Sequence, residues 1–225
     1  MAENVNTKAY WDNRFASGDW EEKNGCWQTQ SFAKGQIPHL DIPRDFAGTI
    51  LDFGCGLGDA LPVYRRHFPK ARLMGMDISS QAIELCRKKY GQWASFFQGT
   101  ADDMPAGVDV IIASNVLEHL DEDIEVARTL RGKCADLYIV VPYREAPLFG
   151  EHVHSYDRNH FSALGPCTQK VFACRGWSSY GRERWLHIYF KNVFRYLLSR
   201  PLRRRNLQIL FHFKGSGAGK APAGF

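Results

Sequence analysis

The sequence contains no apolar run that approaches the ~20 residues needed to cross a membrane. It also lacks a basic-then-apolar leader at its start, and its six cysteines include no C-x-x-C pair. Scattered cysteines in such a chain are usually reduced core thiols, so we expect a cytoplasmic protein without disulfides or zinc. No internal repeat is present, and 225 residues with 44% hydrophobic content suit one α/β domain with a short appendage.

Residues 49–59 (TILDFGCGLGD) are the most informative stretch of the chain. Their short apolar β-formers predict a buried parallel strand, and the alternate glycines Gly54, Gly56 and Gly58 predict a sharp turn before a helix that ends near His67. Glycines remove the Cβ atoms that would hold a ligand away, and N–H groups at a helix start favour a carboxylate or phosphate. The stretch therefore predicts the first half of a βαβ unit that binds a ligand at its turn.

The glycine spacing differs from the dinucleotide fingerprint G-x-G-x-x-G, which would place a glycine where Asp59 stands. A carboxylate, Asp77, ends the next apolar run at 72–77 and is placed to accept both hydroxyls of a ribose. This role is common to NAD sites and S-adenosylmethionine sites. These residues by themselves therefore leave both ligands open.

Three ordered segments, LDFGCGLGD, GMDIS and VIIASNVLEHLDE, resemble the class I S-adenosylmethionine-dependent methyltransferases. The resemblance covers roughly residues 49–160 and is closest to the branch that acts on small molecules, glycans and natural products. It implies a Rossmann-like sheet of seven mostly parallel strands with helices on both faces and an antiparallel last strand at 207–213. It also implies S-adenosyl-L-methionine as cofactor and S-adenosyl-L-homocysteine as product.

Hydrophobic patterning predicts the remaining elements. We expect strands at 95–98, 108–114, 136–142 and 170–174 and helices at 81–90, 122–130 and 157–164. Ser79 or Ser80 and Asp121 are the expected N-caps of the first two of these helices.

Residues 1–48 are expected to form an N-terminal cap, with a helical segment at 6–15 and an aromatic loop around Gly18 and Gly25. The resemblance implies that this segment folds over the cofactor as a lid. An alternative is that its aromatic side chains only pin the helix to the sheet, and both roles can hold together.

The methyltransferase domain is expected at 49–214, with a helical, basic insertion at 182–205 before the last strand. Residues 215–225 are rich in glycine and are expected to form a flexible tail.

The resemblance also implies a set of cofactor contacts. Arg14 suits the methionine carboxylate, and Asp52 either orients the glycine turn or meets the amino end of the methionine. Thr100 stands where relatives carry an acid, so adenine is contacted by the Ala101 backbone with Asp102, or this loop is merely solvated. The expected contacts are Tyr10, Trp11, Arg14, Asp52, Gly54, Cys55, Gly56, Asp77, Ile78, Thr100, Ala101, Asp102 and Asn115.

Methyl transfer from a sulfonium is an in-line displacement, for which a proton acceptor is useful when the nucleophile is a hydroxyl. In relatives a matching Glu-His pair lies near the reacting methyl, which makes His119 the expected base beside Glu118. His154 is the alternative base in the loop at 143–156. A structural role for these residues stays open: Glu118 can brace the loop, His119 can pack, and His154 can belong to a loop network that caps the 157–164 helix.

A metal site is not expected. Some relatives hold a divalent ion with two acids and a histidine around the Glu-His position, but Asn115-Val-Leu precedes Glu118 here and the first acid is missing. His152 and His154 can in principle hold a metal with Glu118 or Glu151, and the missing acid argues against it.

The acceptor is not readable from the residues: a sugar hydroxyl, an amine, a carboxylate and a phenol all fit. We expect a small-molecule or glycan acceptor, including a lipid-linked glycan, with a hydroxyl as nucleophile. The loop at 143–156 and the helix at 185–199 are the expected acceptor pocket, with aromatic contacts from Trp177, Tyr180 and Trp185. Nothing in the sequence sets the oligomeric state.

Three other functions are compatible with parts of the sequence. The arginines at 195–205 suggest an RNA or DNA methyltransferase, but no N/D-P-P-Y/F end follows the fourth strand and no separate basic domain is present. A non-catalytic homologue that binds the cofactor is another reading. The third is a module peripheral to the inner membrane face, because an apolar helical stripe precedes the arginines; we expect instead that the stripe packs on the sheet.

Overall fold

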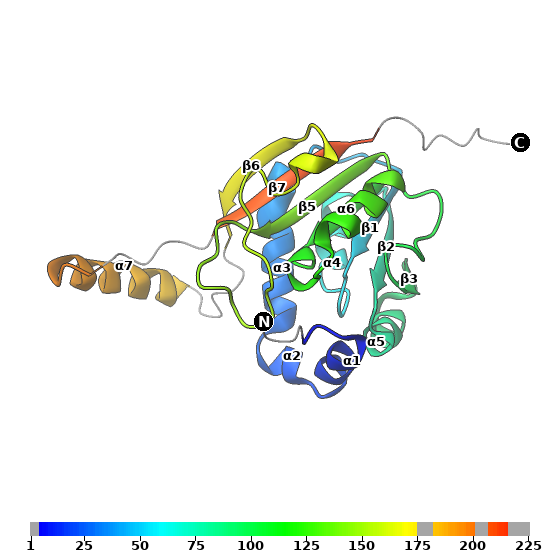
Figure 1. The fold of residues 1–225 in the computed structure, drawn as a ribbon. Coiled ribbons are helices and arrows are strands. Elements are labelled where there is room, and N and C mark those ends of the chain that lie inside the picture. The colour runs from blue at the N-terminus through cyan, green and yellow to red at the C-terminus, as the bar shows by residue number, and fades with distance from the viewer. Residues whose placement is uncertain (1–4, 175–181, 201–206, 216–225) are drawn as a thin grey trace, which may run out of the picture.

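The computed structural model describes residues 5–174, 182–200 and 207–215, with side-chain surroundings from residue 189 onward in the second range. The described residues form a single seven-stranded sheet in the order β3-β2-β1-β4-β5-β7-β6 (Figure 1). Five neighbouring strands are parallel, and β7 runs antiparallel to both β5 and β6. This confirms the predicted fold, including an antiparallel last strand inside the sheet.

The elements have the following bounds. The strands are β1 Thr49–Phe53, β2 Arg72–Asp77, β3 Ala94–Gln98, β4 Val110–Ser114, β5 Asp136–Pro142, β6 Thr168–Ala173 and β7 Leu207–Lys214. The helices are α1 Lys8–Ala16, α2 Asp19–Glu22, α3 Gly25–Gln36, α4 Leu61–His67, α5 Ser80–Tyr90, α6 Asp123–Gly132 and α7 Arg182–Leu197. Short 3₁₀ turns lie at Ile37–His39, Leu117–His119 and Ser162–Leu164.

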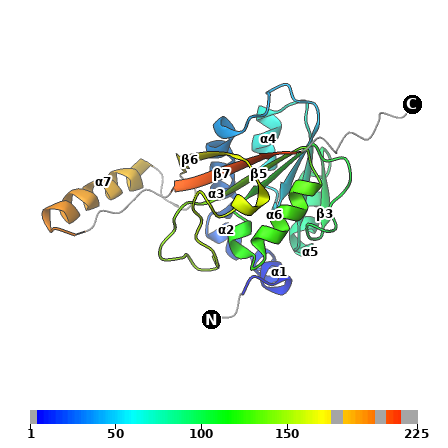
Figure 2. The same cartoon turned by 45° about the horizontal axis from the view of Figure 1, so that its top comes forward.

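Helices cover both faces of the sheet (Figure 2), and each face carries a buried apolar cluster. On one face, α3, α4 and α5 contribute side chains such as Ala33, Tyr64 and Ile83 to the cluster. On the other face, α6 and the segment before β6 contribute Leu130 and Phe161. Strand β1 is buried along its whole length between these layers, which explains its short run of apolar residues.

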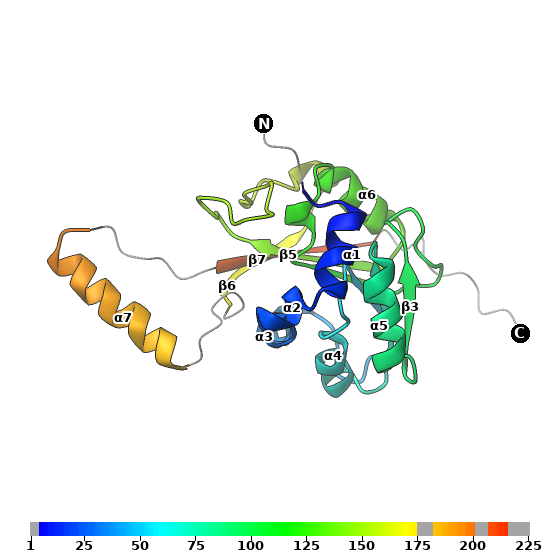
Figure 3. The ribbon, with the colours of Figure 1, turned by 90° about the horizontal axis from the view of Figure 1, so that it is seen from below.

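The N-terminal segment lies at the carboxyl ends of the parallel strands, where α1 packs beside α5 (Figure 3). The predicted aromatic loop around Gly18 and Gly25 is wrong, because residues there form α2 and α3. Gly18 and Asn24 adopt left-handed backbone conformations between the helices, so they redirect the chain without ending its helical character. Gly25 packs so closely on Trp20 that an added Cβ would lie 2.1 Å from its Nε1 atom.

Two local predictions on the other side of the sheet are also wrong. Asp121 is not the N-cap of α6: the cap is Glu122, which makes no side-chain capping bond. The expected helix at 157–164 is reduced to the 3₁₀ turn at its end. Asp157 accepts a hydrogen bond from the Asn159 backbone N–H at 2.8 Å, and such local side-chain bonds compete with helix formation. Ser79, by contrast, is confirmed as the N-cap of α5.

Helix α7 lies apart from the sheet in the structure (Figure 1). Its described apolar side chains are exposed: Phe190 is 57% exposed, Phe194 63% and Leu197 70%. The expectation that this stripe packs on the sheet is therefore wrong for the described side chains. Trp177, Tyr180, the Trp185 side chain and the arginines at 203–205 lie outside the residues and side chains that the structure describes.

Among the helices of the described ranges, none has the length and apolar character that crossing a membrane requires.

The glycine turn after β1 yields a stability prediction. Gly54 and Gly107 both have positive φ, +71° and +76°, but an added Cβ meets Val116 at 2.4 Å in the first case and nothing within 4 Å in the second. We expect Gly107→Ala to lower the free energy of unfolding by about 1 kcal/mol, the cost of a left-handed alanine. Gly54→Ala should cost roughly 2 kcal/mol more, because Val116 must shift. Urea unfolding of both variants measures this, and equal losses would show that Val116 does not limit the turn.

Candidate active site

A cavity of about 240 Å³ lies at the carboxyl ends of β1, β2 and β4. Its walls come from α1, α3, the glycine turn and the loops that follow β2, β3 and β4. It brings together most of the residues expected to contact a cofactor, together with the expected base. These residues are Trp11, Arg14, Asp52, Gly54, Cys55, Gly56, Asp77, Ile78, Thr100, Ala101, Asn115 and His119.

Asp77 ties the two strand ends of the cavity together. One carboxylate oxygen accepts the Gly56 N–H at 2.8 Å, and the other accepts the Ser79 N–H at 2.9 Å. The backbone N–H groups of Gly54 and Cys55 donate to the carbonyl oxygen that precedes Asp77, at 2.8 and 2.9 Å. Burial raises the pKa of Asp77, and the backbone donors partly oppose this shift. The carboxylate is thus oriented at the cavity wall by the turn that it stabilises.

Asp52 is the second buried acid of the cavity. It lies near the end of β1, and burial together with the charge of Asp77 raises its pKa to about 8. The group is therefore mainly protonated at neutral pH when no cation is nearby.

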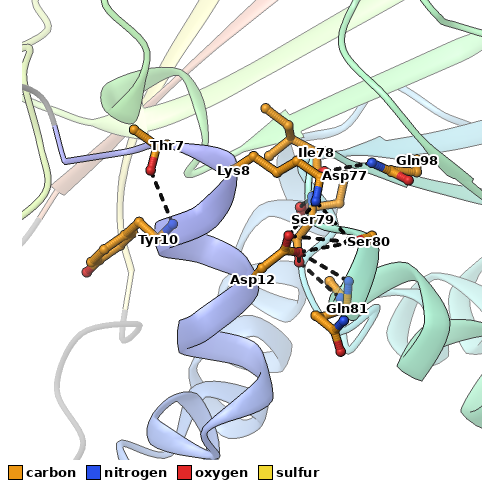
Figure 4. A network of polar contacts seen from close by, with 11 residues as sticks. Thr7, Lys8, Tyr10, Asp12, Asp77, Ile78, Ser79, Ser80, Gln81 and Gln98 are labelled. Atoms are coloured by element: carbon orange, nitrogen blue, oxygen red, sulfur yellow. Dashed lines mark hydrogen bonds and ion pairs between the residues drawn. The ribbon is translucent and has the colours of Figure 1, made fainter.

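One side of α1 is attached to the start of α5 (Figure 4). Asp12 accepts hydrogen bonds from the Ser79 hydroxyl at 2.6 Å and the Gln81 backbone N–H at 3.2 Å, and it pairs with Lys8. Burial opposes the charge on Asp12, but the hydrogen bonds from Lys8 and Ser79 dominate and lower its pKa to about 2. This ionised carboxylate lies at a helix N-terminus, where negative charge is stabilised.

The opposite side of α1 is attached to the loop after β5. The Glu151 carboxylate pairs with Arg14 and accepts a hydrogen bond from the Tyr10 hydroxyl at 2.6 Å. The Glu151 carbonyl oxygen accepts a further hydrogen bond from the Asn6 side chain at 2.7 Å. Tyr10 itself does not line the cavity and contacts Arg14 and Glu151 instead. Helix α1 therefore spans the cavity from α5 to this loop.

His119 lines the cavity between Trp11 and His152, with ring centroids 5.3 and 5.0 Å away. Its Nδ1 lies 3.2 Å from the Glu151 carbonyl oxygen. Burial and the proximity of His152 lower the pKa of His119 to about 4, so the ring is neutral at pH 7. A neutral imidazole at the wall can accept a proton or coordinate a cation.

Glu118 lies behind His119 and does not line the cavity. Its side chain is fully buried, and neither carboxylate oxygen has a hydrogen-bonding partner among the described residues. Burial raises the pKa of Glu118 to about 7, although the nearby His152 lowers it. In His152, burial opposes the charge, but the carboxylates of Glu145 and Glu118 together raise the pKa.

Two predicted residues lie outside the cavity. His154 contacts the Leu120 carbonyl oxygen at 2.8 Å and belongs to a structural network around Asp123, which also binds the Tyr156 hydroxyl at 2.9 Å. Asp102 is exposed and does not line the cavity.

The loop that carries Thr100 has a structural reason for its sequence. Both the N–H and the hydroxyl of Thr100 donate to the Asp103 carboxylate at 2.9 Å. Asp103 therefore closes the turn instead of facing the cavity.

Residues 51–136 match the family described as "Methyltransferase domain". Over these residues the chain carries a methyltransferase domain, which supports the class I S-adenosylmethionine-dependent methyltransferases as its family. The matched span runs from the glycine turn to the start of β5 and so contains the cavity's Asp52, Asp77 and His119.

Curated relatives of the methyltransferase domain match over part of their length. Malonyl-[acyl-carrier protein] O-methyltransferase of Halalkalibacterium halodurans is 32% identical over 96 residues, which are 39% of this chain and 35% of that protein. Trans-aconitate 2-methyltransferase of Afipia carboxidovorans is 28% identical over 85 residues, 37% of this chain and 33% of that protein. The chain thus spans about a third of the length of the curated relatives it matches.

Solved structures share the fold over nearly the whole chain. The complex between the Haloferax volcanii Trm112 methyltransferase activator and a methyltransferase matches with a TM-score of 0.62 and 16% identity, covering 94% of this chain and 98% of that one. The plantazolicin methyltransferase BpumL in complex with SAH matches with a TM-score of 0.52 and 18% identity, covering 92% and 95%. At these identities the likeness shows the fold.

Several residues that line the cavity of the methyltransferase domain were not predicted. One group of them, Gln28, Phe32 and Gln36, comes from α3, and their four-residue spacing is the signal that indicates one helical face. Glu151 was considered only as a metal ligand, and its contact with α1 depends on a loop conformation that no local pattern encodes. The unpredicted lining includes Asn6, Phe15, Trp20, Gln28, Phe32, Gln36, Tyr64 and Glu151.

The raised pKa of Asp52 gives a pH prediction. The unfolded pKa of an aspartate is about 3.9, so the folded protein binds an extra proton between about pH 4 and 8, and this contribution to stability is lost as pH rises through that window. We expect Asp52→Asn to gain stability relative to wild type between pH 5 and 8.5 by on the order of 2 kcal/mol. Urea unfolding at several pH values measures the difference, with the exposed Asp45→Asn as matched control. Parallel curves for Asp52→Asn and wild type would contradict the assignment.

Proposed function

We propose that this protein transfers the methyl group of S-adenosylmethionine to a small-molecule or glycan acceptor, with a hydroxyl oxygen as the accepting atom. The observation that carries the proposal is the cavity itself. The glycine turn and Asp77 line the part of the cavity that we assign to the nucleoside, and the neutral His119 lines the same cavity. Two relatives of the domain have O-methyltransferase in their names, which supports an oxygen acceptor.

The residues of the glycine turn fit the cofactor. An added Cβ on Gly56 would lie 3.4 Å from the Phe15 ring, so only glycine leaves the space between the turn and α1 open. Asp77 uses one lone pair of each oxygen for the backbone, and its remaining lone pairs are the proposed acceptors for the ribose hydroxyls. Ile78, Thr100 and Ala101 would flank the adenine.

The methionine end of the cofactor would lie between Asp52 and Arg14. The ammonium group of the cofactor suits Asp52. A cation beside this buried carboxyl would lower its pKa and so ionise it. The Arg14 guanidinium already holds Glu151 through one nitrogen, and its Nε lies 3.6 Å from the Asp19 carboxylate, beyond hydrogen-bonding distance. Its other donors are proposed to hold the methionine carboxylate. Residues 1–48 would then form a lid that also contributes a side chain to cofactor binding.

The acceptor side is assigned to His119. When bound, the cofactor supplies a methyl group on a sulfonium, and the chain must align the acceptor and remove its proton. His119 lines the cavity and is neutral, so it can take the proton of a hydroxyl. His154 is not retained as an alternative base, because it lies in the Asp123 network outside the cavity.

Calorimetry tests the cofactor assignment. Wild type should bind S-adenosylhomocysteine and not NADH, and Asp77→Asn should weaken binding by about 1–3 kcal/mol through loss of a buried charged partner. Asp45→Asn, an exposed acid elsewhere, serves as the matched control, and urea unfolding checks that each variant is folded. Binding of NADH in place of the methyl-donor product would remove the proposed function.

The acceptor assignment is tested by release of S-adenosylhomocysteine across pools of acceptors, with mass spectrometry of any methylated product. His119→Gln should lower turnover about 10²-fold or more while it leaves S-adenosylhomocysteine affinity unchanged, because a proton acceptor is lost but not a binding group. Wild-type turnover in this variant would exclude His119 from the reaction.

We also propose that α7 contacts an anionic lipid surface. Its exposed Phe190, Phe194 and Leu197 follow a helical spacing of one face. No Asp or Glu follows Glu183 in the sequence, whereas Lys191, Arg195, Arg200 and the arginines at 203–205 do. An apolar helical face with uncompensated positive charge suits the interface of an anionic bilayer.

Sedimentation with vesicles tests this contact. The protein should pellet with vesicles that contain phosphatidylserine and remain in solution with phosphatidylcholine alone, and high salt should release it. The double change Phe190→Ser/Phe194→Ser should abolish pelleting, while Leu85→Ser, which alters a partly exposed leucine on α5, should not. The lipid assignment would be contradicted if wild type stayed in solution with these vesicles. It would also be contradicted if the double change abolished self-association of the protein instead of vesicle binding.

A further inference from the structure

The loop after β5 brings His152 beside Glu118 and His119, which follow β4. One ligand atom from each of these three side chains lies within 4.8 Å of the others. All three residues are buried. The Val153 backbone N–H donates to the Glu118 carbonyl oxygen at 2.8 Å, which holds the two segments in this arrangement. The fold thus assembles one carboxylate and two imidazoles from separate loops.

The carboxylate of this group is the unexpected element. Glu118 is 0% exposed, and neither of its oxygens has a hydrogen-bonding partner among the described residues. A buried carboxylate without donors is strongly disfavoured unless a cation compensates it. In contrast, the buried acids Asp59, Asp77 and Asp123 each accept at least one hydrogen bond from a neighbouring group. Glu118 is therefore built to meet a ligand that is not a protein hydrogen-bond donor.

Both imidazoles are oriented through their Nδ1 atoms. Nδ1 of His152 contacts the Glu145 carboxylate, and Nδ1 of His119 lies 3.2 Å from the Glu151 carbonyl oxygen. An oxygen acceptor on one ring nitrogen is the arrangement that prepares the other nitrogen, here Nε2, for a metal. The rings contact each other edge to face, with centroids 5.0 Å apart.

We propose that Glu118, His119 and His152 bind a divalent transition metal ion of the Zn²⁺ type. Two imidazoles and one carboxylate are a ligand set of zinc sites that keep an open position. His119 is the member that lines the cavity, so the open position faces the place assigned to the acceptor. The sequence argument against a metal considered the missing acid before Glu118, and the structure supplies His152 in its place.

The role of this ion would be to hold the acceptor oxygen. That role rests on the proposed methyl transfer, whereas the metal site does not. With the ion bound, His119 would be a ligand, and the ion would lower the pKa of the acceptor hydroxyl so that its proton can leave to solvent. The inference therefore deepens the proposed function and changes the assignment of one residue within it.

The test uses the full chain after treatment with a chelator. Titration with Co²⁺, followed by visible absorption, and with Zn²⁺, followed by calorimetry, should show one site per chain. Glu118→Gln and His152→Gln should each weaken the affinity at least about tenfold, as loss of a ligand or its support does. His67→Gln, which removes a histidine at the end of α4, is the matched control and should bind like wild type.

Thermal unfolding of the metal-free proteins separates a ligand from a structural residue. Glu118→Gln should be at least as stable as wild type without metal, because it removes the unpartnered carboxylate, and only wild type and the control should gain stability from Zn²⁺. Absence of a wild-type site, or equal metal affinity in Glu118→Gln, overturns the proposal. Parallel titration with S-adenosylhomocysteine keeps the two inferences distinct. If S-adenosylhomocysteine binds but neither metal ion does, the metal site alone is overturned. If a metal ion binds but S-adenosylhomocysteine does not, the proposed methyl transfer is overturned.

Discussion

The interaction on which the rest of the site depends is the pair of backbone hydrogen bonds to Asp77. One side chain at the end of β2 accepts from Gly56 in the turn after β1 and from Ser79 at the start of α5. Three segments that are separate in the sequence are thereby held at fixed spacing around a cavity. Because parallel strands end at the same edge of a sheet, a single carboxylate at that edge can organise both neighbouring loops.

The second constraint is the way α1 spans the cavity. Asp12 and Arg14 are two positions apart on one helix, so their side chains point in different directions. The first reaches the N-terminus of α5 and the second reaches Glu151 in the loop after β5. The same helix therefore contacts α5 on one side of the cavity and the loop after β5 on the other. Trp11, the residue before Asp12, packs on His119 and lines the cavity.

How far the sequence predicts this structure depends on the range of the interactions involved. The strand at 72–77, its terminal Asp77 and the Ser79 cap follow from local patterns, and all three are found where expected. The sequence does not reveal the lining from α3, because glycine and polar residues obscure its helical period and the buried Gln36 depends on a hydrogen bond to Tyr64 of α4. His154 lies outside the cavity because Asp123, distant in sequence, holds it in a structural network. The Glu118, His119 and His152 group likewise depends on a loop path that the residues themselves do not reveal.

The attachment of α1 at two edges has a consequence for the order of events. Glu151 belongs to the loop after β5, and its carboxylate is bound to α1, so any displacement of α1 must break the contacts that fix this loop beside His119. Under the proposed function, entry of the cofactor and departure of the methylated product would therefore be linked. Such a protein would exchange its cofactor and its acceptor during the same opening of the cavity rather than through two independent openings.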